Sequence, residues 1–212
     1  MNKTLLIMLM FAGLAVAACD KAGWTDAEKS LIENQDDVMR VLTVENDADL
    51  AVLRTVCRDF TSEELADPLY GQLAAKMIAT VTSPDQDGVG IAGPQVGISR
   101  NVIAVQRFDK VGEPFEVYPN IRITATRGEP EAGSEGCLSV PGRRGIVLRY
   151  KDIDISYTSP ETGATVTETV QGFTAVIFQH ETDHLLGILY TDKLVPDTAA
   201  SPNSAAGAET SK

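Results

Sequence analysis

The sequence predicts an α+β fold, with small antiparallel sheets around a buried central helix. Residues 172–186 are apolar on nearly every side of a helical projection, which is typical of a helix enclosed by the rest of the protein. Short runs rich in β-branched and aromatic residues precede this helix and are predicted strands: 101–105, 114–118, 121–125, 152–157 and 164–171. Turn-forming residues separate the last two runs and predict a hairpin.

Local signals predict the remaining elements. Residues 40–44 are expected to form a short strand. Asp67 and Pro68 favour a helix start, as the capping residue and the first helical residue, and apolar residues at helical spacing continue it to about residue 83. Gly187 is a natural end for the central helix.

We expect four segments along the chain. Residues 1–18 predict a signal peptide, and residues 19–37 a tether that contains a short helix, because Thr25 and Glu28 form a capping-box pattern. Residues 38–195 are long enough for one domain with its own core. Residues 196–212 are rich in Ala, Ser, Thr, Pro and Gly, and we expect a disordered tail.

The charge balance argues against nucleic acid as a partner. The formal net charge is −12, and no cluster of Lys or Arg occurs in the sequence. Nucleic-acid-binding domains usually carry a basic stripe that matches the phosphate backbone. We therefore expect no nucleic-acid partner.

The N-terminus has the pattern of an export signal. Lys3 precedes an almost unbroken apolar run over residues 5–16, which is too short to span a membrane, and small residues follow. Residues 16–19, Val-Ala-Ala-Cys, resemble the lipobox of bacterial lipoproteins, which implies cleavage before Cys19 and a lipid anchor on Cys19. We expect a membrane-anchored protein that faces the periplasm or the outside. An ordinary cleaved signal peptide, or a misassigned start before a cytoplasmic protein, is the alternative.

Both histidines of the chain lie in the run Gln-His-Glu-Thr-Asp-His, residues 179–184. Residues four apart share a helix face, so His180 and His184 can bind one metal ion. Glu181 lies beside the first ligand and can act as a general base on water. The alternative is a chance match on a solvated helix face. Against it, the flanking apolar residues would bury these polar groups without a partner, which is costly.

A metal ion held by two imidazoles needs a third protein ligand, from a Cys, Asp or Glu elsewhere. Cys137 lies in Glu-Gly-Cys-Leu-Ser, residues 135–139, and spacing alone leaves a ligand role and a packing role equally open. Cys57 lies in an apolar segment and is expected to be a small buried apolar residue. A disulfide between Cys57 and Cys137 is the alternative in an oxidising compartment.

Three segments resemble the motifs of the peptide deformylase family. Residues 88–95, Gly-Val-Gly-Ile-Ala-Gly-Pro-Gln, resemble its glycine-rich motif ending in Gln. Residues 135–139 and the run His-Glu-Thr-Asp-His over 180–184 match its other two motifs. All three occur in the family's order, and the similarity spans about residues 49–194. The resemblance implies that residues 38–195 are a deformylase-like catalytic domain.

The resemblance implies hydrolysis of the N-formyl group of N-terminal formylmethionine on peptides or nascent chains, with release of formate. Cys137, His180 and His184 would hold one divalent cation, iron(II) in many members and zinc as the alternative. Glu181 would take a proton from the attacking water and later give it to the leaving amine.

Other residues are expected to have supporting roles, those of Gln95, Leu138 and the glycine-rich segment because of the same resemblance. The side chain of Gln95 and the backbone N–H of Leu138 would bind the formyl oxygen as charge builds on it. A substrate peptide would lie as an added strand against the segment that contains Gly88, Gly90 and Ile91. Asp183 would support the ligand imidazoles. Glu135 and Arg149 would form a structural ion pair.

Three departures from the family pattern leave the ligands and Glu181 intact: Gly93 replaces an alanine, Val176 replaces an arginine, and the C-terminal helix is absent. Two other functions remain open. The chain could be a non-catalytic lipoprotein that keeps the fold to bind N-formyl peptides or metal. It could also be a zinc peptidase, although such enzymes usually take a third His or Glu downstream, and the sequence has no third His.

Overall fold

The structure is a computed structural model and describes residues 23–196, so the expected signal peptide, Cys19 and the tail from residue 197 lie outside the described residues. Within residues 23–196, no helix is long and apolar enough to cross a membrane. The helices are α1 Asp26–Ile32, α2 Asp47–Leu53, α3 Ser62–Ala66, α4 Pro68–Val81 and α5 Gly172–Leu185, with short 3-10 helices η1 Gly93–Val96 and η2 Tyr190–Asp192.

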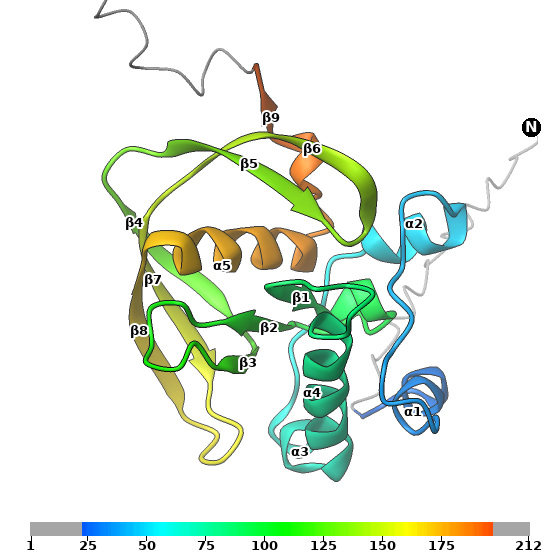
Figure 1. Ribbon diagram of the computed structural model, residues 1–212. Coiled ribbons are helices and arrows are strands. Elements are labelled where there is room, and N and C mark those ends of the chain that lie inside the picture. Colours follow the sequence, from blue (N-terminus) through cyan, green and yellow to red (C-terminus); the bar gives the residue numbers. More distant parts are fainter. Residues whose placement is uncertain (1–22, 197–212) are drawn as a thin grey trace, which may run out of the picture.

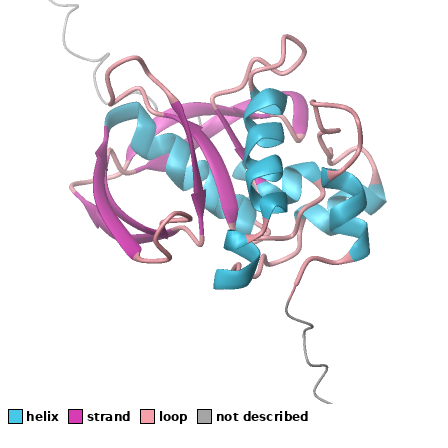
Figure 2. Cartoon of the chain, turned by 90° about the horizontal axis from the view of Figure 1, so that it is seen from below, coloured by secondary structure: helices cyan, strands magenta, loops and turns pink. Residues whose placement is uncertain are grey.

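The described strands form three antiparallel sheets of three strands each, in the orders β1-β2-β3, β4-β7-β8 and β5-β6-β9. Their bounds are β1 Gly90–Ala92, β2 Val102–Gln106, β3 Phe115–Pro119, β4 Arg122–Arg127, β5 Glu131–Cys137, β6 Val140–Arg149, β7 Asp152–Thr158, β8 Thr165–Gln171 and β9 Leu194–Val195. Helices α1 to α4 gather on one side of the molecule, away from β4, β7 and β8 (Figures 1 and 2). This arrangement confirms the predicted α+β class.

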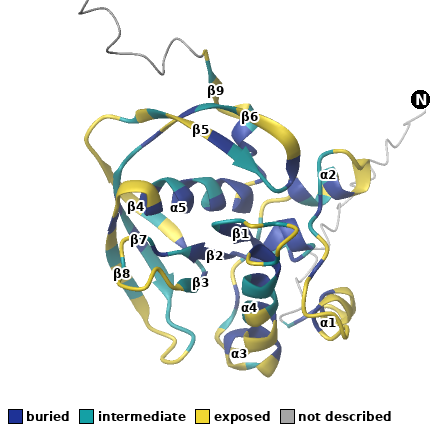
Figure 3. Ribbon diagram, in the orientation of Figure 1, coloured by how far each residue is buried: buried dark blue, intermediate teal, exposed yellow. Residues whose placement is uncertain are grey.

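Helix α5 lies at the centre, between the β5–β6 hairpin and the β1-β2-β3 sheet (Figure 1). It packs on β1, β2 and η1 and also on the β4-β7-β8 sheet. Most of its side chains are buried (Figure 3), and Phe178 lies in a core with Ile153, Ile155 and Tyr118. Gly187 follows the helix with a φ of 69°, which agrees with its predicted role at the helix end.

The predicted helix start at Asp67 and the predicted hairpin are both present. The Asp67 side chain accepts a hydrogen bond from the backbone N–H of Leu69, and α4 begins at Pro68. Strands β7 and β8 pair from Asp152 with Gln171 to Thr158 with Thr165. In β7, buried apolar residues alternate with less buried residues, as expected for a strand with one face in the core.

The prediction of a strand over residues 40–44 is wrong. The segment is extended, and its N–H groups donate hydrogen bonds to the carbonyl oxygens of Gln95 and Ser139. Those partners belong to η1 and to the turn between β5 and β6, so no ladder forms. The strand-like composition therefore produced an extended connection instead of a sheet strand.

The hairpin of β5 and β6 was not predicted from the sequence. Its strands contain many Gly, Glu and Arg residues, which carry little β-sheet signal. Their pairing runs from Glu131 with Arg149 to Cys137 with Val140, with a register shift after Gly136. This hairpin places Cys137 beside the C-terminal half of α5, and the candidate site depends on it.

Part of the expected tether over residues 19–37 belongs to the folded body. Helix α1 has the predicted capping box of Thr25 and Glu28. Ile32 is fully buried, and Trp24 packs with Phe60. Glu28 also forms an ion pair with the buried Arg100. The tether prediction failed here because the partners of α1 lie far along the chain and give no local signal.

Candidate active site

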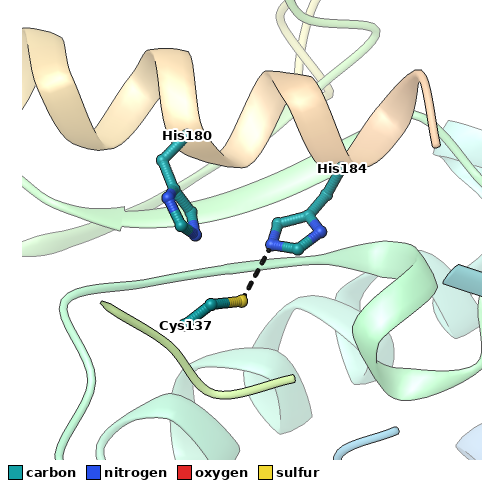
Figure 4. A group of neighbouring side chains, drawn as sticks. All are labelled: Cys137, His180 and His184. Atoms are coloured by element: carbon teal, nitrogen blue, oxygen red, sulfur yellow. Dashed lines mark hydrogen bonds between the residues drawn. The ribbon is translucent and has the colours of Figure 1, made fainter. Parts of the chain in front are cut away.

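Three predicted metal ligands come together between β5 and α5. His180 and His184 project from the same face of α5, one turn apart, and Cys137 approaches from the end of β5 (Figure 4). Their ligand atoms all lie within 4.8 Å of one another, and Cys137 Sγ is 3.2 Å from His184 Nε2. The structure thus gives Cys137 a ligand position, which spacing alone left open.

A chain of polar contacts fixes the first imidazole. His180 Nδ1 is 2.8 Å from Glu135 Oε2, so its Nε2 is left to face the other ligand atoms. Arg149 donates to both oxygens of Glu135, at 2.8 and 3.0 Å. The predicted ion pair is therefore present, and it also orients a ligand, a role that the sequence did not reveal.

Asp183 supports the site through this chain, and its carboxylate is hydrogen-bonded to neither imidazole. Its carboxylate accepts a hydrogen bond from Arg149 Nη1 at 2.6 Å, and Lys193 Nζ lies 2.6 Å from its other oxygen. Because Asp183 and His180 both belong to α5, the contacts form a closed ring through Arg149 and Glu135 of the hairpin. Asp183 thus positions Arg149, which positions Glu135.

The two imidazoles differ in proton affinity. Burial opposes protonation of His180, but its contacts with Cys137 and Glu135 outweigh burial and raise its pKa to about 10. A cation at Nε2 would displace that proton. Burial and the neighbouring His180 lower the pKa of His184 well below its usual value. His184 is therefore neutral, as a metal ligand must be.

Glu181 is buried beside the ligands. Burial raises the pKa of its carboxyl to about 7, and its Oε2 has no hydrogen-bond partner among the described residues. A Cβ added at Gly90 would lie 2.6 Å from Glu181 Oε1. Gly90 is therefore required where β1 passes this carboxylate. A buried carboxyl that titrates near neutral pH suits a general base.

Gln95 is held with its amide group directed at the ligands. Its Oε1 accepts a hydrogen bond from the N–H of Ala92 at 2.8 Å, which leaves the Nε2 group facing Ser139 Oγ at 3.2 Å and Cys137 Sγ at 3.6 Å. Leu138 follows Cys137 in the turn and lines a cavity beside the ligands. Both predicted oxyanion donors thus lie beside the ligand cluster.

A cavity of about 850 Å³ opens from the ligands. Gly88, Gly90, Gln95 and Glu181 line it. Ile91 does not line the cavity, because it is fully buried and its side chain lies in the core; its predicted role, through main-chain hydrogen bonds of β1, stays a prediction. Sequence reasoning missed the apolar wall of Val89, Phe173, Val176 and Ile177. The helical spacing of the last three to His180 was a signal that could have found it.

Cys57 and Cys137 are both free, so the alternative disulfide between them is not formed. Cys57 packs against the core around α5, as expected for a small apolar residue, and burial raises its thiol pKa to about 12. A thiol of this kind is unreactive. The role of ligand falls to Cys137.

The donor set fits a divalent transition metal. One thiolate and two imidazoles suit iron(II) or zinc, and three protein ligands leave a coordination position open for chemistry. Glu181 Oε2 lies beside this set without a hydrogen-bond partner. A buried polar atom normally has a partner, so a group bound at the site is expected to supply one.

Comparison with known proteins agrees with the geometry. The family model for polypeptide deformylase matches residues 38–200. The peptide deformylase of Caulobacter sp. (strain K31) is 40% identical over 158 residues, which cover 74% of this chain and 88% of that one. That of Symbiobacterium thermophilum is 45% identical over 106 residues, 50% of this chain and 48% of that one.

A solved structure shows the same fold. The class I type b peptide deformylase of Acinetobacter baumannii, with Met-Ala-Ser bound, superimposes with a TM-score of 0.65 at 36% identity, and the match covers 74% of this chain and 98% of that chain. Sequence, fold and the arrangement of side chains agree: this chain belongs to the polypeptide deformylase family of metal-dependent hydrolases.

Proposed function

We propose that the chain removes the N-formyl group from N-terminal formylmethionine of peptides, with Cys137, His180 and His184 as the metal ligands. The observation that carries this assignment is the position of Glu181. Its buried carboxylate lies beside three converging ligand atoms and lines the cavity that a peptide must enter. The reaction is hydrolysis of a linear amide.

The protein's own groups divide the work of that hydrolysis. When bound, a divalent cation supplies Lewis acidity, which lowers the pKa of water and polarises a carbonyl oxygen. Glu181 takes one proton from the attacking water as the new C–O bond forms. Gln95 Nε2 and the backbone N–H of Leu138 donate to the formyl oxygen as negative charge builds on it. The C–N bond then breaks, and Glu181 gives its proton to the leaving amine.

The peptide main chain has a natural partner in β1. This strand is at the edge of the β1-β2-β3 sheet, and Gly90 at its start lines the cavity. An extended peptide can add to such an edge through backbone hydrogen bonds. Met-Ala-Ser, the peptide bound in the Acinetobacter baumannii structure, has the length for this mode of binding.

For the metal we propose iron(II), with zinc as the alternative. The ligand set favours neither strongly, since thiolate and imidazole bind both ions. Protein purified without oxygen should contain mainly iron by elemental analysis. Its activity should decay in air, whereas zinc-loaded protein should keep its activity because zinc has no redox chemistry. Iron-free protein from an anaerobic preparation would contradict this assignment.

The catalytic function is favoured over the alternatives by particular residues. A lipoprotein that only bound formyl peptides or metal would need neither Glu181 nor the amide orientation that Ala92 imposes on Gln95. A zinc peptidase would need a third ligand downstream of His184, and Cys137 of β5 already occupies that role.

Formate release tests the proposed function. The substrate is formyl-Met-Ala-Ser, and the protein is the chain from Asp20, loaded without oxygen with iron(II) or with zinc. We expect metal-dependent formate release that Glu181→Ala abolishes. Stoichiometric metal binding without formate release, with either metal, would overturn the deformylase function and favour the binding protein.

We also propose that Cys19 carries a lipid and holds the enzyme on a membrane, facing the periplasm or the outside. The support is the sequence over residues 1–19. Cys19→Ala should move the protein from the membrane fraction to the soluble fraction and remove the lipid mass from its N-terminal peptide. An unprocessed N-terminus on the parent protein would instead favour a cytoplasmic enzyme.

A further inference from the structure

The cavity has two walls of different character. On β5, Glu131, Gly133, Glu135 and Cys137 share the inner face of the strand and line the cavity, and Ser134 and Gly136 near its end also reach it. On α5, the inward positions lie one helical turn apart and end at His180 and Glu181. The wall on α5 is apolar before His180, whereas the facing wall on β5 has no side chain at Gly133.

The apolar wall of the cavity on α5 suits the side chain of the formylated residue. The formyl group belongs at the ligand end, beside Cys137 and Glu181. Next along α5 come Ile177, Val176 and Phe173, and Val89 adjoins them from the segment before β1. Phe173 packs against Phe108, with ring centroids 5.4 Å apart. These residues form what we call the first-residue pocket.

Gly133 leaves this pocket open on the β5 side. A Cβ built at Gly133 would meet no atom within 4 Å, and its φ lies outside the left-handed region. Neither the backbone nor the packing therefore requires glycine there. Gly90 is different, because a Cβ at that position would collide with Glu181 and Ile177. The absent side chain at position 133 thus adds volume to the pocket without being needed for the fold.

We propose that Gly133 is a specificity-determining residue, and that the pocket it enlarges accepts an aromatic first residue as well as methionine. This inference rests on the proposed deformylase function. A flat aromatic ring needs more room than an unbranched side chain, and the missing side chain at Gly133 leaves room in the cavity that Val176 and Phe173 also line. Methionine, being flexible and narrow, fills the same space less completely.

The test is a comparison of two substrates, formyl-Met-Ala-Ser and formyl-Phe-Ala-Ser, with the full chain loaded with iron(II) without oxygen. The variant Gly133→Ile places a β-branched side chain in the pocket, at a strand position that favours it. We expect the ratio of kcat/KM for the Phe peptide to that for the Met peptide to fall by about tenfold or more. The value of kcat/KM for the Met peptide should fall less than that for the Phe peptide, since a loss of pocket volume acts mainly on the larger side chain.

A matched control places the same bulk on the other face of the strand. Ala132 does not line the cavity, so Ala132→Ile should leave the substrate ratio of the parent protein unchanged. Gly133→Ala and Gly133→Val provide a graded series that still decides the question if the larger substitution impairs folding. The ratio should fall steadily with side-chain volume.

Several outcomes would overturn the inference. The parent protein could already reject the Phe peptide, the Gly133 series could leave the ratio unchanged, or Ala132→Ile could shift it as much as Gly133→Ile does. A parent protein that releases no formate from the Met peptide would instead contradict the proposed function. The two failures are therefore distinguishable in one set of assays.

Discussion

Two buried arginines, Arg100 and Arg149, stand at the centre of similar clusters with different consequences. Arg100 binds Glu28 on α1 and Glu64 on α3, and Arg149 binds Glu135 on β5 and Asp183 on α5. Each arginine thus joins two carboxylates from separate elements. Buried arginines of this kind need such partners, because an unpaired buried charge is costly.

The clusters differ in where the carboxylate oxygens end. Around Arg100, the remaining contacts of Glu28 and Glu64 cap their own helices at Thr25 and Thr61, or go to Arg58 and to the backbone N–H of Gly23. Around Arg149, Glu135 Oε2 is shared between the guanidinium and the imidazole of His180. The first cluster therefore only fastens α1 and α3 to the body. In the second cluster, a similar ionic arrangement also orients the metal ligand His180.

The largest expected effect comes from Glu181, the buried carboxylate that belongs to neither cluster. Glu181→Gln should lower kcat by about 10³-fold, because the general base is lost while the shape is kept. Thr182→Ala, on the same helix, should change kcat by less than about threefold, because the hydroxyl of the half-buried Thr182 donates only to carbonyl oxygens of α5 and not to the reacting groups. Formate release measures both. A Glu181→Gln variant with near-normal kcat would assign the proton transfer to another group.

The same substitution should change the pH dependence of metal-free protein. The folded-state pKa of Glu181 is about 7, raised by burial from an ordinary 4.5. The folded parent protein therefore loses stability as the pH rises from about 5 through 7, because the buried carboxyl must ionise. Urea unfolding of Glu181→Gln should lack this loss. If the free energy of unfolding depends on pH in the same way in both proteins, the pKa of Glu181 is not raised in the folded state.

Next in size is the loss of the shared carboxylate of the Arg149 cluster. Glu135→Ala should reduce the free energy of unfolding by about 3–5 kcal/mol, since it removes one partner of a buried ion pair. It should also weaken metal binding by about 10- to 100-fold, because His180 loses its orienting contact. Chelator competition measures the affinity. Unchanged affinity would reduce this cluster to the purely structural role of the other one.

The matching change in the Arg100 cluster should affect stability alone. Glu64→Ala should also cost about 3–5 kcal/mol in urea unfolding, with unchanged metal affinity. Its exposed neighbour provides the control, since Glu63→Ala should stay within about 0.5 kcal/mol of the parent protein. A loss of metal affinity in Glu64→Ala would show that the two clusters are coupled.

The stability that the ionised Glu64 carboxylate contributes should also be lost in acid. Burial opposes ionisation of this carboxyl, but hydrogen bonds from Arg58 and Arg100 outweigh burial and lower its pKa to about 2. The resulting stability is present above the unfolded value of 4.5 and is lost as the pH falls toward 2. Unfolding of Glu64→Ala should therefore be less sensitive to acid than unfolding of the parent protein.

The smallest effect is expected at the rim of the Arg149 cluster. Lys193 is paired with Asp183 but its side chain is 39% exposed. Lys193→Ala should therefore cost no more than about 1 kcal/mol, and the difference should shrink at high salt. Urea unfolding with and without added salt measures it. A loss as large as that of Glu135→Ala would mean that Lys193 is part of the buried cluster.

The sequence was informative where the signal was local. The spacing of His180 and His184 on an apolar helix predicted both the central helix and two ligands. The pairing of Arg100 with Glu28 joins residues 72 positions apart, and no pattern near either residue indicates it. For the same reason α1 was expected to be a tether. Motif similarity marked the segment of Ile91 but does not tell which of its side chains face the cavity, and that of Ile91 lies in the core.

The hairpin of β5 and β6 lies between these extremes. Its alternation of Glu131, Gly133, Glu135 and Cys137 places them on one face, yet none of these residues is a strong strand former. That face is recognised as the inner one only from the position of the hairpin over α5 in the structure. Glu135 was accordingly predicted as the partner of Arg149 but not as the partner of His180.

The ring of contacts through His180, Glu135, Arg149 and Asp183 also bears on how the enzyme acquires its metal. It fastens the hairpin to α5 independently of any cation, so the cation is a second cross-link between parts that are already joined. Ligands held in this way can release and rebind an ion without unfolding the protein. We therefore expect loading to occur after folding. The ion in the mature enzyme would then reflect which metal the surroundings supply, and one protein could exchange iron for zinc as that supply changes.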